Sequence, residues 1–481
     1  MNKPLRHVWL VIALLFVLLF TSTTYFQVFA AGRLNADGRN SRTLYNEFGR
    51  NRGPIVVDGT PIAWSEESDD TYGYLRTYEP GGMYAPVTGY YSVRYGFAGL
   101  ERSLNDTLSG DADSLFYQRI ADTLSGRATQ GATVELTLDA EAQQVAYEAL
   151  GDRRGAVVAL DPATGEILAM VSTPSYDPNR LASHDTGDVT QAWSDLNEDP
   201  DRPLSNRAIA GDLYPPGSTF KLLVAATALD SGGYTKDSVI PGPGTYTLPG
   251  SSSVMNNHAG GGQEPCGPDD RSTLQSALQQ SCNTSFAMLG VELGAEALQA
   301  KTAEYGFGDR MSIPLGVTPS TIGTDLDDSQ LATTSIGQYE DRVTPLQMAM
   351  VAGSFANDGV VMEPNLVRSV RTQDLRTVSE FSPQERSQPL SAANAAQMRE
   401  MMVATVEDGT GSAAQIDGVE VGGKTGTAEW GEGRTAHSWF VGYAQAGDRK
   451  VAVAVIVEEG GYGSQVAAPI AKDVMEAVID Q

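Results

Sequence analysis

The sequence predicts an α/β (α+β) protein with a central antiparallel sheet flanked by helices, preceded by a small mixed domain and one transmembrane helix. Apolar runs at 155–161 and 166–171 are separated by a short turn that contains glycine, which is the pattern of a β-hairpin. The segments 438–443 and 451–457 supply further strands late in the chain. The mostly apolar residues that follow Ser218 predict a buried helix between these two groups of strands.

The composition excludes several classes of partner. The chain has 481 residues, with 33 Lys+Arg against 60 Asp+Glu, and its net charge is −27. Proteins that bind polyphosphates neutralise them with Lys and Arg, so no nucleic-acid partner is predicted. Lysine is scarce, with seven residues in the chain. Two cysteines rule out a disulfide-built scaffold, and four scattered histidines offer no helical metal pair, so neither a metal ion nor a cofactor is predicted.

The N-terminal residues predict a membrane anchor. Residues 1–7 form a short tail, and 8–31 are 24 consecutive uncharged residues that begin with an unbroken apolar run. At about 1.5 Å per residue they make roughly 36 Å of helix, enough to cross a hydrocarbon core of about 30 Å. A cleaved signal peptide is the alternative, because Val28-Phe29-Ala30 resembles a cleavage site. Positive charges lie on both sides of the span, so they do not decide its orientation.

The rest of the chain divides near residue 154 into two predicted domains. Residues 32–154 are rich in Tyr, Gly and Arg, carry short β-like runs, and end in a helix at 141–150. Residues 155–481 contain the predicted sheet. Within them, the stretch 241–270 is rich in Gly, Pro and Ser and is predicted to be a loop, and loops of that length are usually functional or mobile.

Ser218 and Lys221 form the first candidate chemical motif. Pro-Pro-Gly precedes Ser218, so the serine is predicted in the first turn of the buried helix. A serine there can simply cap the helix. However, Lys221 lies three residues further on, which puts its amine and the serine hydroxyl on one face. Burial among apolar residues lowers the pKa of a lysine toward that of a usable base, and a serine beside such a base is the arrangement of nucleophilic catalysis.

Two further motifs supply polar groups. Ser281 and Asn283 stand two residues apart, which lets a hydroxyl and an amide project into one cleft from a turn or short helical segment. Lys424, Thr425, Gly426 and Thr427 are predicted on a strand of the sheet, where the glycine allows close approach to a ligand. Residues 418–425 also fit the pattern of a phosphate-binding loop. The glycines that follow cannot hold the helix that such a loop requires, so nucleotide hydrolysis is rejected.

These motifs, in this order, resemble those of penicillin-binding proteins and serine β-lactamases. The spacing of Ser218, Ser281 and Lys424 and the opening segment 155–179 are similar to a penicillin-binding transpeptidase domain. Upstream segments resemble the monofunctional class B members: Arg52-Gly53-Pro54-Ile55, Gly99-Leu100-Glu101 and Leu136-Thr137-Leu138-Asp139. The resemblance is to the short actinobacterial penicillin-binding protein A type, and it implies a non-catalytic, dimerisation-like role for residues 32–154.

The resemblance implies a role for each motif residue. Ser218 attacks the penultimate D-Ala carbonyl of a stem peptide, Lys221 takes its proton, and Ser281 relays a proton to the leaving group. The implied remaining roles are a substrate hydrogen bond from Asn283, positive charge from Lys424, carboxylate binding by Thr425, Gly426 and Thr427, and an oxyanion hole from the backbone N–H groups of Ser218 and Thr427. β-Lactams are expected to acylate the same serine.

The implied function is peptidoglycan D,D-transpeptidation during wall synthesis and cell division. The expected partners are stem peptides with a D-Ala-D-Ala donor and an amine acceptor, a membrane glycosyltransferase and division proteins. This chemistry places the N-terminus in the cytoplasm and the catalytic domain outside it. A D,D-carboxypeptidase, a β-lactamase-type hydrolase and a non-enzymatic division scaffold remain alternatives. In an oxidising extracytoplasmic setting, Cys266 and Cys282 are expected to form a disulfide, although two separate thiols are the other interpretation.

Overall fold

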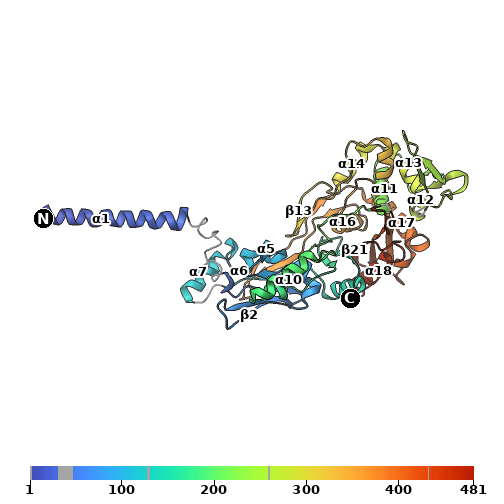
Figure 1. Cartoon of the computed structure of the whole chain (residues 1–481). Helices are drawn as coiled ribbons and strands as arrows, with labels where there is room; N and C mark the ends of the chain where they lie inside the picture. Colours follow the sequence, from blue (N-terminus) through green and yellow to red (C-terminus); the bar gives the residue numbers. More distant parts are fainter. Residues whose placement is uncertain (1–2, 31–46, 127–129, 258–260, 432, 481) are drawn as a thin grey trace.

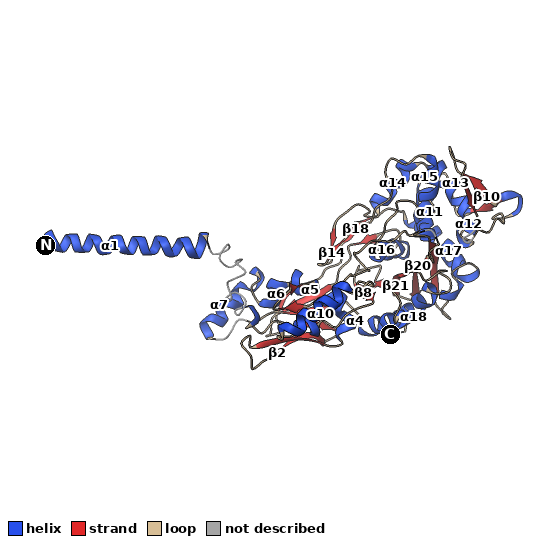
Figure 2. Ribbon diagram, viewed as in Figure 1, coloured by secondary structure: helices blue, strands red, loops and turns tan. Residues whose placement is uncertain are grey.

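The structure is a computed structural model that describes residues 3–30, 47–126, 130–257, 261–431 and 433–480. Its first element is the apolar helix α1 (Lys3–Thr24), which continues as the π-helical turn η1 (Tyr25–Phe29) and stands apart from the rest of the molecule (Figures 1 and 2). Together they are long and apolar enough to cross a membrane. The described helix includes Lys3 and Arg6 before the predicted span, and the last residue of that span, Ala31, lies outside the described residues.

A six-stranded sheet forms the base of the N-terminal part, in the order β17-β16-β6-β1-β2-β3. Its strands are β1 (Ile55–Val57), β2 (Thr60–Glu67), β3 (Tyr74–Tyr78), β6 (Thr133–Leu136), β16 (Val367–Arg371) and β17 (Thr377–Glu380). β1 and β6 pair in parallel, and the other neighbours are antiparallel. Two of the strands come from far beyond residue 155, so this sheet contains chain from both sides of the predicted boundary at 154/155.

Short elements join or follow the strands of this sheet. They are α4 (Gly81–Thr88), the two-residue strands β4 (Tyr91–Ser92) and β5 (Gly96–Phe97), α5 (Gly99–Ser103), α6 (Asn105–Ser109), the 3₁₀ turn η2 (Asp113–Leu115) and α7 (Phe116–Ser125). Among them, α5, α6 and α7 lie toward α1 (Figure 1). Glu101 lies at the centre of this part, where it is fully buried and pairs with two arginines. Arg52 Nε donates to one carboxylate oxygen of Glu101 at 2.5 Å and Arg76 Nε to the other at 2.6 Å.

The central sheet of the C-terminal part has five strands in the order β19-β20-β21-β7-β8. They are β7 (Gly155–Leu160), β8 (Ile167–Thr173), β19 (Glu420–Ala428), β20 (His437–Ala446) and β21 (Arg449–Val457). Every neighbouring pair is antiparallel, as the sequence predicts. β19 is an edge strand, so one of its sides is free to face other parts of the chain.

Helices pack on both faces of this sheet (Figure 2), which explains why its strands are unbroken apolar runs. Val157 and Ala159 point into a core shared with α8 (Ala140–Leu150) and α18 (Ala467–Ile479). The alternate residues of the same strand, Ala156 and Val158, point into a second and larger core. That core contains the helices α11 (Lys221–Asp230) and α16 (Pro345–Ala356).

Of the remaining elements, α9 packs against β3 of the N-terminal sheet and α10 packs against α9, whereas α11 to α14 gather at the end of the molecule farthest from α1 (Figure 1). The helices and helical turns are α9 (Asn179–Ala182), α10 (Thr186–Glu198), η3 (Gly217–Phe220), η4 (Pro268–Asp270), α12 (Leu274–Gln279), α13 (Asn283–Leu293), α14 (Ala295–Glu304), α15 (Asp328–Thr334), α17 (Ala392–Asp408) and η5 (Ser412–Ala414). The short strands are β13 (Met311–Ser312), β14 (Gly316–Val317), β15 (Val361–Met362) and β18 (Glu385–Ser387).

The stretch 241–270 is not entirely a loop, so that prediction was wrong in part. It contains the two-stranded hairpin β10 (Thr245–Thr247) and β11 (Val254–Asn256), and it is flanked by the paired strands β9 (Val239–Pro241) and β12 (Arg271–Thr273). Threonine and tyrosine favour the extended conformation, and the Gly- and Ser-rich residues between the strands form the connecting turn. The strands are only three residues long, which is why the composition of the whole stretch concealed them.

Candidate active site

Ser218 is held on a tight turn against the edge of the central sheet. The residue before it, Gly217, has φ 54° and donates its N–H to the carbonyl of Gly337 at 2.8 Å. A Cβ atom added to Gly337 would stand 2.0 Å from the carbonyl oxygen of Gly217, so a side chain there would force the two backbones apart. On the other side, the indole N–H of Trp439 donates to the carbonyl of Pro215 at 3.0 Å. These contacts fix the position from which Ser218 enters its turn.

The turn that carries Ser218 is the 3₁₀ turn η3, and the α-helix α11 begins only at Lys221. In 3₁₀ geometry residues three apart lie almost directly above one another, so Ser218 and Lys221 share one side as predicted. No hydrogen bond joins their side chains, and none of the residues that the structure describes bonds the Ser218 hydroxyl. The hydroxyl is partly exposed and opens toward a cavity.

Lys221 is completely buried, and its amine is bonded to the second motif. Nζ donates to the backbone carbonyl of Ser281 at 2.8 Å and to Oδ1 of Asn283 at 2.7 Å, and it lies 3.4 Å from the Ser281 hydroxyl. Among the residues described, no carboxylate forms an ion pair with it. Burial first, and the charge of nearby Lys424 second, therefore lower the pKa of Lys221 well below its usual range.

Lys424 reaches the same hydroxyl from the sheet. It lies on β19, as predicted, and its Nζ donates to Oγ of Ser281 at 2.8 Å and to the carbonyl of Thr425 at 2.9 Å. The side chain is fully buried, and this burial lowers the pKa of Lys424 to about 7. The Ser281 hydroxyl is thus in contact with two buried amines, one from each side. This hydroxyl therefore links the second motif to the lysines of the first and third motifs.

The second motif is held in place by the Gly-rich stretch. Ser281 has a positive φ of 62° in the connection from α12 to α13, and Asn283 is the first residue of α13. Between them, Cys282 forms a disulfide with Cys266, with 6.1 Å between the Cα atoms, so the disulfide prediction is confirmed. The backbone N–H of Asn283 also donates to the carbonyl of Asn257 at 2.8 Å. The disulfide and this bond tie the stretch to the motif.

The cavity in front of Ser218 has a volume of about 690 Å³ and is also lined by Asn283 and Thr427. Thr425 is placed differently, because the residue is buried and its hydroxyl donates to Oγ1 of Thr410 at 2.8 Å. Gly426 is buried against the side chain of Thr219 and the backbone of Pro216. The third motif therefore presents Thr427 to the cavity, while Thr425 is bonded away from it.

The backbone of Thr427 faces the Ser218 turn. In an antiparallel edge strand, the N–H and C=O of alternate residues point away from the sheet on the same side. The carbonyl of Thr427 lies 3.0 Å from where a Cβ atom of Gly217 would stand, so this residue is one that points outward. Its N–H consequently shares the side on which Ser218 lies. The Thr427 N–H, which the resemblance implies for an oxyanion hole, therefore faces the turn that carries Ser218.

Several residues that shape the site could not be predicted from the sequence. Gly337, Trp439, Asn257 and Thr410 all contact the motifs, and none carries a signal that separates it from ordinary packing residues. Each acts through a contact between segments far apart in sequence, such as Trp439 with Pro215, which only the fold reveals. Among the residues described, no group of three or more His, Cys, Asp or Glu side chains is arranged to hold a metal ion.

Comparison with known proteins places this site in a family. Residues 155–476 match the family described as penicillin binding protein transpeptidase domain, and residues 52–134 match the penicillin binding protein A dimerisation domain. The chain therefore belongs to the penicillin-binding protein transpeptidases. Within that family it is a class B protein, as the resemblance implies, similar over its whole length to the peptidoglycan D,D-transpeptidase PbpA of Mycolicibacterium smegmatis, with 43% identity covering 100% of this chain and 99% of the relative.

Further relatives agree. PbpA of Mycobacterium tuberculosis is 41% identical over 100% of this chain and 99% of its own length. Among solved structures, the penicillin G acyl-enzyme complex of M. tuberculosis penicillin-binding protein A has a TM-score of 0.84, with 41% identity over 89% of this chain and 99% of that one. The imipenem acyl-enzyme complex of the same protein has a TM-score of 0.86, with 40% identity over 90% of this chain and 99% of that one.

Proposed function

We propose that this protein is a peptidoglycan D,D-transpeptidase in which Ser218 is the nucleophile. Ser218 Oγ attacks the carbonyl of the penultimate D-Ala of a donor stem peptide, and the terminal D-Ala leaves. The acyl chain stays on Ser218 as an ester until the amine of a second stem peptide takes it. The observation that carries the proposal is the convergence of two fully buried lysines on the Ser281 hydroxyl beside the Ser218 cavity.

Lys221 is the general base for the Ser218 hydroxyl. A base must be neutral before it can accept a proton, and the lowered pKa of Lys221 supports that state at neutral pH. Its amine is one helical turn from Ser218, on the same side. A substrate that fills the cavity and excludes water brings the two groups together, because catalytic contacts often tighten only in the complex.

Ser281 and Lys424 carry the proton onward to the departing D-Ala amine. The bond of 2.8 Å between Lys424 Nζ and Ser281 Oγ supports this route. Asn283 holds the donor peptide by its amide, and Thr427 binds the terminal carboxylate with Lys424 supplying positive charge. Thr425 supports that strand through Thr410. The backbone N–H groups of Ser218 and Thr427 stabilise the oxyanion, a contribution of roughly 3–4 kcal/mol in other enzymes.

The membrane topology belongs to the same proposal. α1 anchors the protein, with the N-terminus in the cytoplasm and the catalytic part on the outer side, where the peptidoglycan is. The Cys266–Cys282 disulfide supports that location, because disulfides persist in oxidising compartments. Residues 32–154 serve as a non-catalytic support for the catalytic part at 155–481. A membrane glycosyltransferase and division proteins are the partners that the family resemblance implies.

Intact-protein mass spectrometry after penicillin treatment tests the proposal. We expect one stable adduct on the wild type, none on Ser218→Ala, and the wild-type result on Ser103→Ala. Ser103 is the matched control because it is exposed and has an asparagine two residues later, like Ser281, but lies in α5. An adduct that survives in Ser218→Ala, or no adduct on the folded wild type, would refute the assignment of Ser218.

The fate of the acyl group on Ser218 distinguishes the transpeptidase from the alternative functions. A carboxypeptidase passes the acyl group to water even when an amine is present, whereas a transpeptidase forms the amide product in proportion to the amine. A β-lactamase-type hydrolase turns penicillin over rapidly and accumulates no adduct. If the protein were a non-enzymatic scaffold, its Ser218→Ala variant would support growth as well as the wild type does.

A further inference from the structure

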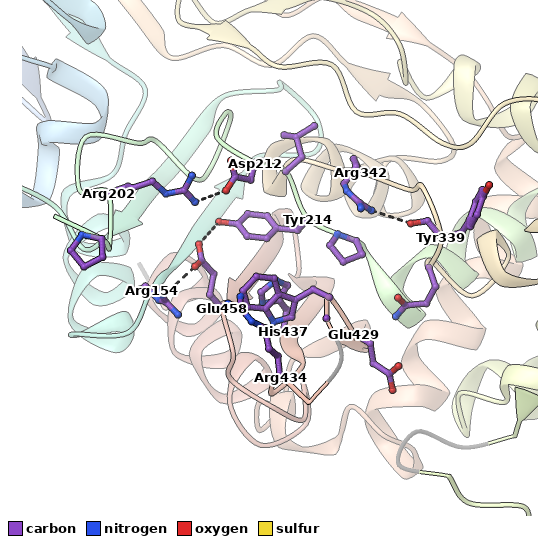
Figure 3. Close-up of a pocket in the computed structure, with 16 residues that line it drawn as sticks. Arg154, Arg202, Asp212, Tyr214, Tyr339, Arg342, Glu429, Arg434, His437 and Glu458 are labelled. Carbon is purple, nitrogen blue, oxygen red and sulfur yellow. Dashed lines mark hydrogen bonds and ion pairs between the residues drawn. The ribbon is translucent and has the colours of Figure 1, made fainter. Parts of the chain in front are cut away.

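Figure 3 shows a second cavity, of about 900 Å³, which adjoins the one lined by Ser218. The two cavities share part of their walls, and the residues common to both are Gln338, Glu429, Gly431 and Arg434. The second cavity is otherwise lined by residues from the segments before β7 and η3, from 339–342, from the β19–β20 connection and the start of β20, and by Glu458 just after β21. The residues that line only this second cavity have no part in the mechanism proposed for acylation.

Arginines gather in this cavity although the protein as a whole is strongly acidic. Four line it: Arg154, Arg202, Arg342 and Arg434. Two of them are already neutralised. Arg202 pairs with Asp212 at 2.5 Å, and Arg154 contacts Asp201 at 3.2 Å and Glu459 at 3.0 Å.

Arg434 lies 3.9 Å from Glu459 and stacks over the Trp430 ring, so Arg342 is the arginine of this cavity without a carboxylate partner among the described residues. Its Nη1 donates to the backbone carbonyls of Tyr339 at 3.2 Å and Asp341 at 2.7 Å, and no carboxylate among the described residues pairs with it. The backbone bonds hold the guanidinium in place while its remaining N–H groups stay available. A guanidinium fixed in this way is suited to binding a carboxylate through two parallel hydrogen bonds.

Glu429 provides the opposite charge where the two cavities meet. It belongs to both linings, its side chain is exposed, and no cation among the described residues forms an ion pair with it. Figure 3 shows Arg342 and Glu429 on the same side of Tyr214, with Arg154 and Arg202 on the other side. One side of the cavity thus presents an unpaired cation and an unpaired anion, next to the cavity that contains Ser218.

We propose that the second cavity binds the acceptor of transpeptidation and favours an acceptor amine whose own carbon carries a carboxylate. The carboxylate pairs with Arg342, and Glu429 attracts the ammonium group to the junction with the Ser218 cavity. After it loses a proton, the amine nitrogen attacks the ester carbonyl. A C–N bond forms, the bond from the carbonyl carbon to Ser218 Oγ breaks, and the displaced oxygen takes up a proton to restore the hydroxyl. This inference rests on the proposed function.

Two acceptor peptides that differ only in this carboxylate test the inference. One carries a diaminopimelate side chain, whose amine stands beside a carboxylate, and the other carries lysine, which has the amine alone. The full-length protein is given a D-alanyl thioester donor with either acceptor, and the amide and hydrolysis products are quantified by mass. We expect the wild type to prefer the diaminopimelate acceptor and Arg342→Gln to lose that preference by roughly tenfold, the effect of one charge-assisted contact.

Arg376→Gln is the matched control, because Arg376 is also exposed and lies in the turn between β16 and β17. It should keep the wild-type preference. An absence of preference in the wild type, or a loss in Arg342→Gln that is equal for the two acceptors, would overturn the inference. Penicillin adduct formation is measured on the same samples. Adducts with no acceptor preference contradict only this inference, whereas the absence of an adduct on the wild type contradicts the proposed function itself.

Discussion

In the N-terminal part a buried carboxylate is neutralised by two arginines, whereas the two buried lysines of the active site have no charged partner among the described residues. Glu101 is fully buried, but Arg52 and Arg76 bond its two oxygens. Burial alone would raise the pKa of Glu101, yet the charges of the two arginines outweigh it and lower that pKa. Lys221 and Lys424 are buried to the same extent and bond only neutral oxygens, so their pKa values fall.

The comparison shows that the effect of burying a charged side chain depends on whether it has a partner of opposite charge. A buried ion with partners of opposite charge keeps its charge and holds segments together. A buried cation without such a partner gives up its proton easily, which is what proton transfer at neutral pH requires. Lys301 provides a comparison within the catalytic part. It is also buried, but it pairs with Asp230 at 2.6 Å and Glu304 at 2.5 Å.

The largest expected effect comes from Lys221→Arg. An arginine stays charged and cannot take the proton of Ser218, so we expect penicillin acylation to slow by about 10²–10⁴-fold. The rate is followed by intact-protein mass over time. Lys301→Arg, the matched buried control, should acylate at nearly the wild-type rate. Equal rates for the two variants would break the contrast between paired and unpaired lysines.

Glu101→Gln tests the paired side of the comparison. It leaves two buried guanidiniums without their carboxylate, which should lower the free energy of unfolding of the N-terminal part by about 3–5 kcal/mol. Denaturant unfolding followed by tryptophan fluorescence measures this change, with the exposed Glu67→Gln as control. Acylation by the folded protein under native conditions should be unaffected. An unchanged unfolding midpoint would show that the buried cluster does not hold this part together.

Removal of the disulfide should have the next largest effect. Replacing Cys266 and Cys282 together by serine opens a loop closed over a sequence separation of 16 residues, a loss of about 3 kcal/mol in stability. It also releases Ser281 and Asn283, the partners of Lys221, so acylation should slow. The stability and the acylation rate of the double variant are compared with those of the wild type, which is measured with and without reductant. Wild-type stability and acylation in the double variant would contradict this role of the disulfide.

The stability of both parts should rise with pH, but in different pH ranges. The pKa of Lys424 is lowered from 10.5 to about 7 on folding, so between these values the unfolded chain holds more protons and the stability contribution of Lys424 rises with pH. Glu101 has a lowered carboxyl pKa, so its contribution is present above 4.5 and is lost as the pH falls through the folded value.

Unfolding midpoints measured across pH check this contrast. The gain in stability of Lys424→Met over the wild type should shrink as the pH rises from about 7 to about 10, the window in which the unfolded chain alone keeps the lysine proton. The loss in Glu101→Gln should shrink instead as the solution is made acidic. Differences that do not vary with pH would contradict both assignments.

The sequence predicted the elements whose signal is local and missed the contacts that join distant segments. Unbroken apolar runs such as 451–457 indicated strands of a sheet covered on both faces, and the spacing of Ser218 and Lys221 indicated a shared face. The ion pair of Arg52 with Glu101 joins segments 49 residues apart. Nothing in either segment shows that they meet, although both belong to motifs quoted for the family resemblance.

Two further features could not be predicted from the sequence for the same reason. Strands β16 and β17 join the N-terminal sheet from residues 367–380, and a division of the chain by composition cannot detect such a return. The bond of Lys221 with Asn283, rather than with Ser218, depends on the positive φ of Ser281 and the disulfide next to it. Its geometry follows from the fold and not from the spacing of the motifs.

Direct titration of the lysine side chains tests the central claim that two buried lysines lack a charged partner and have lowered pKa values. The chain has seven lysines, so an NMR spectrum of isotope-labelled lysine is simple enough to assign by single Lys→Arg variants. The signal that disappears in Lys424→Arg should titrate near pH 7, and the one that disappears in Lys221→Arg should titrate well below 10.5. If both signals titrate near 10.5, the value of an ordinary lysine, the account is wrong.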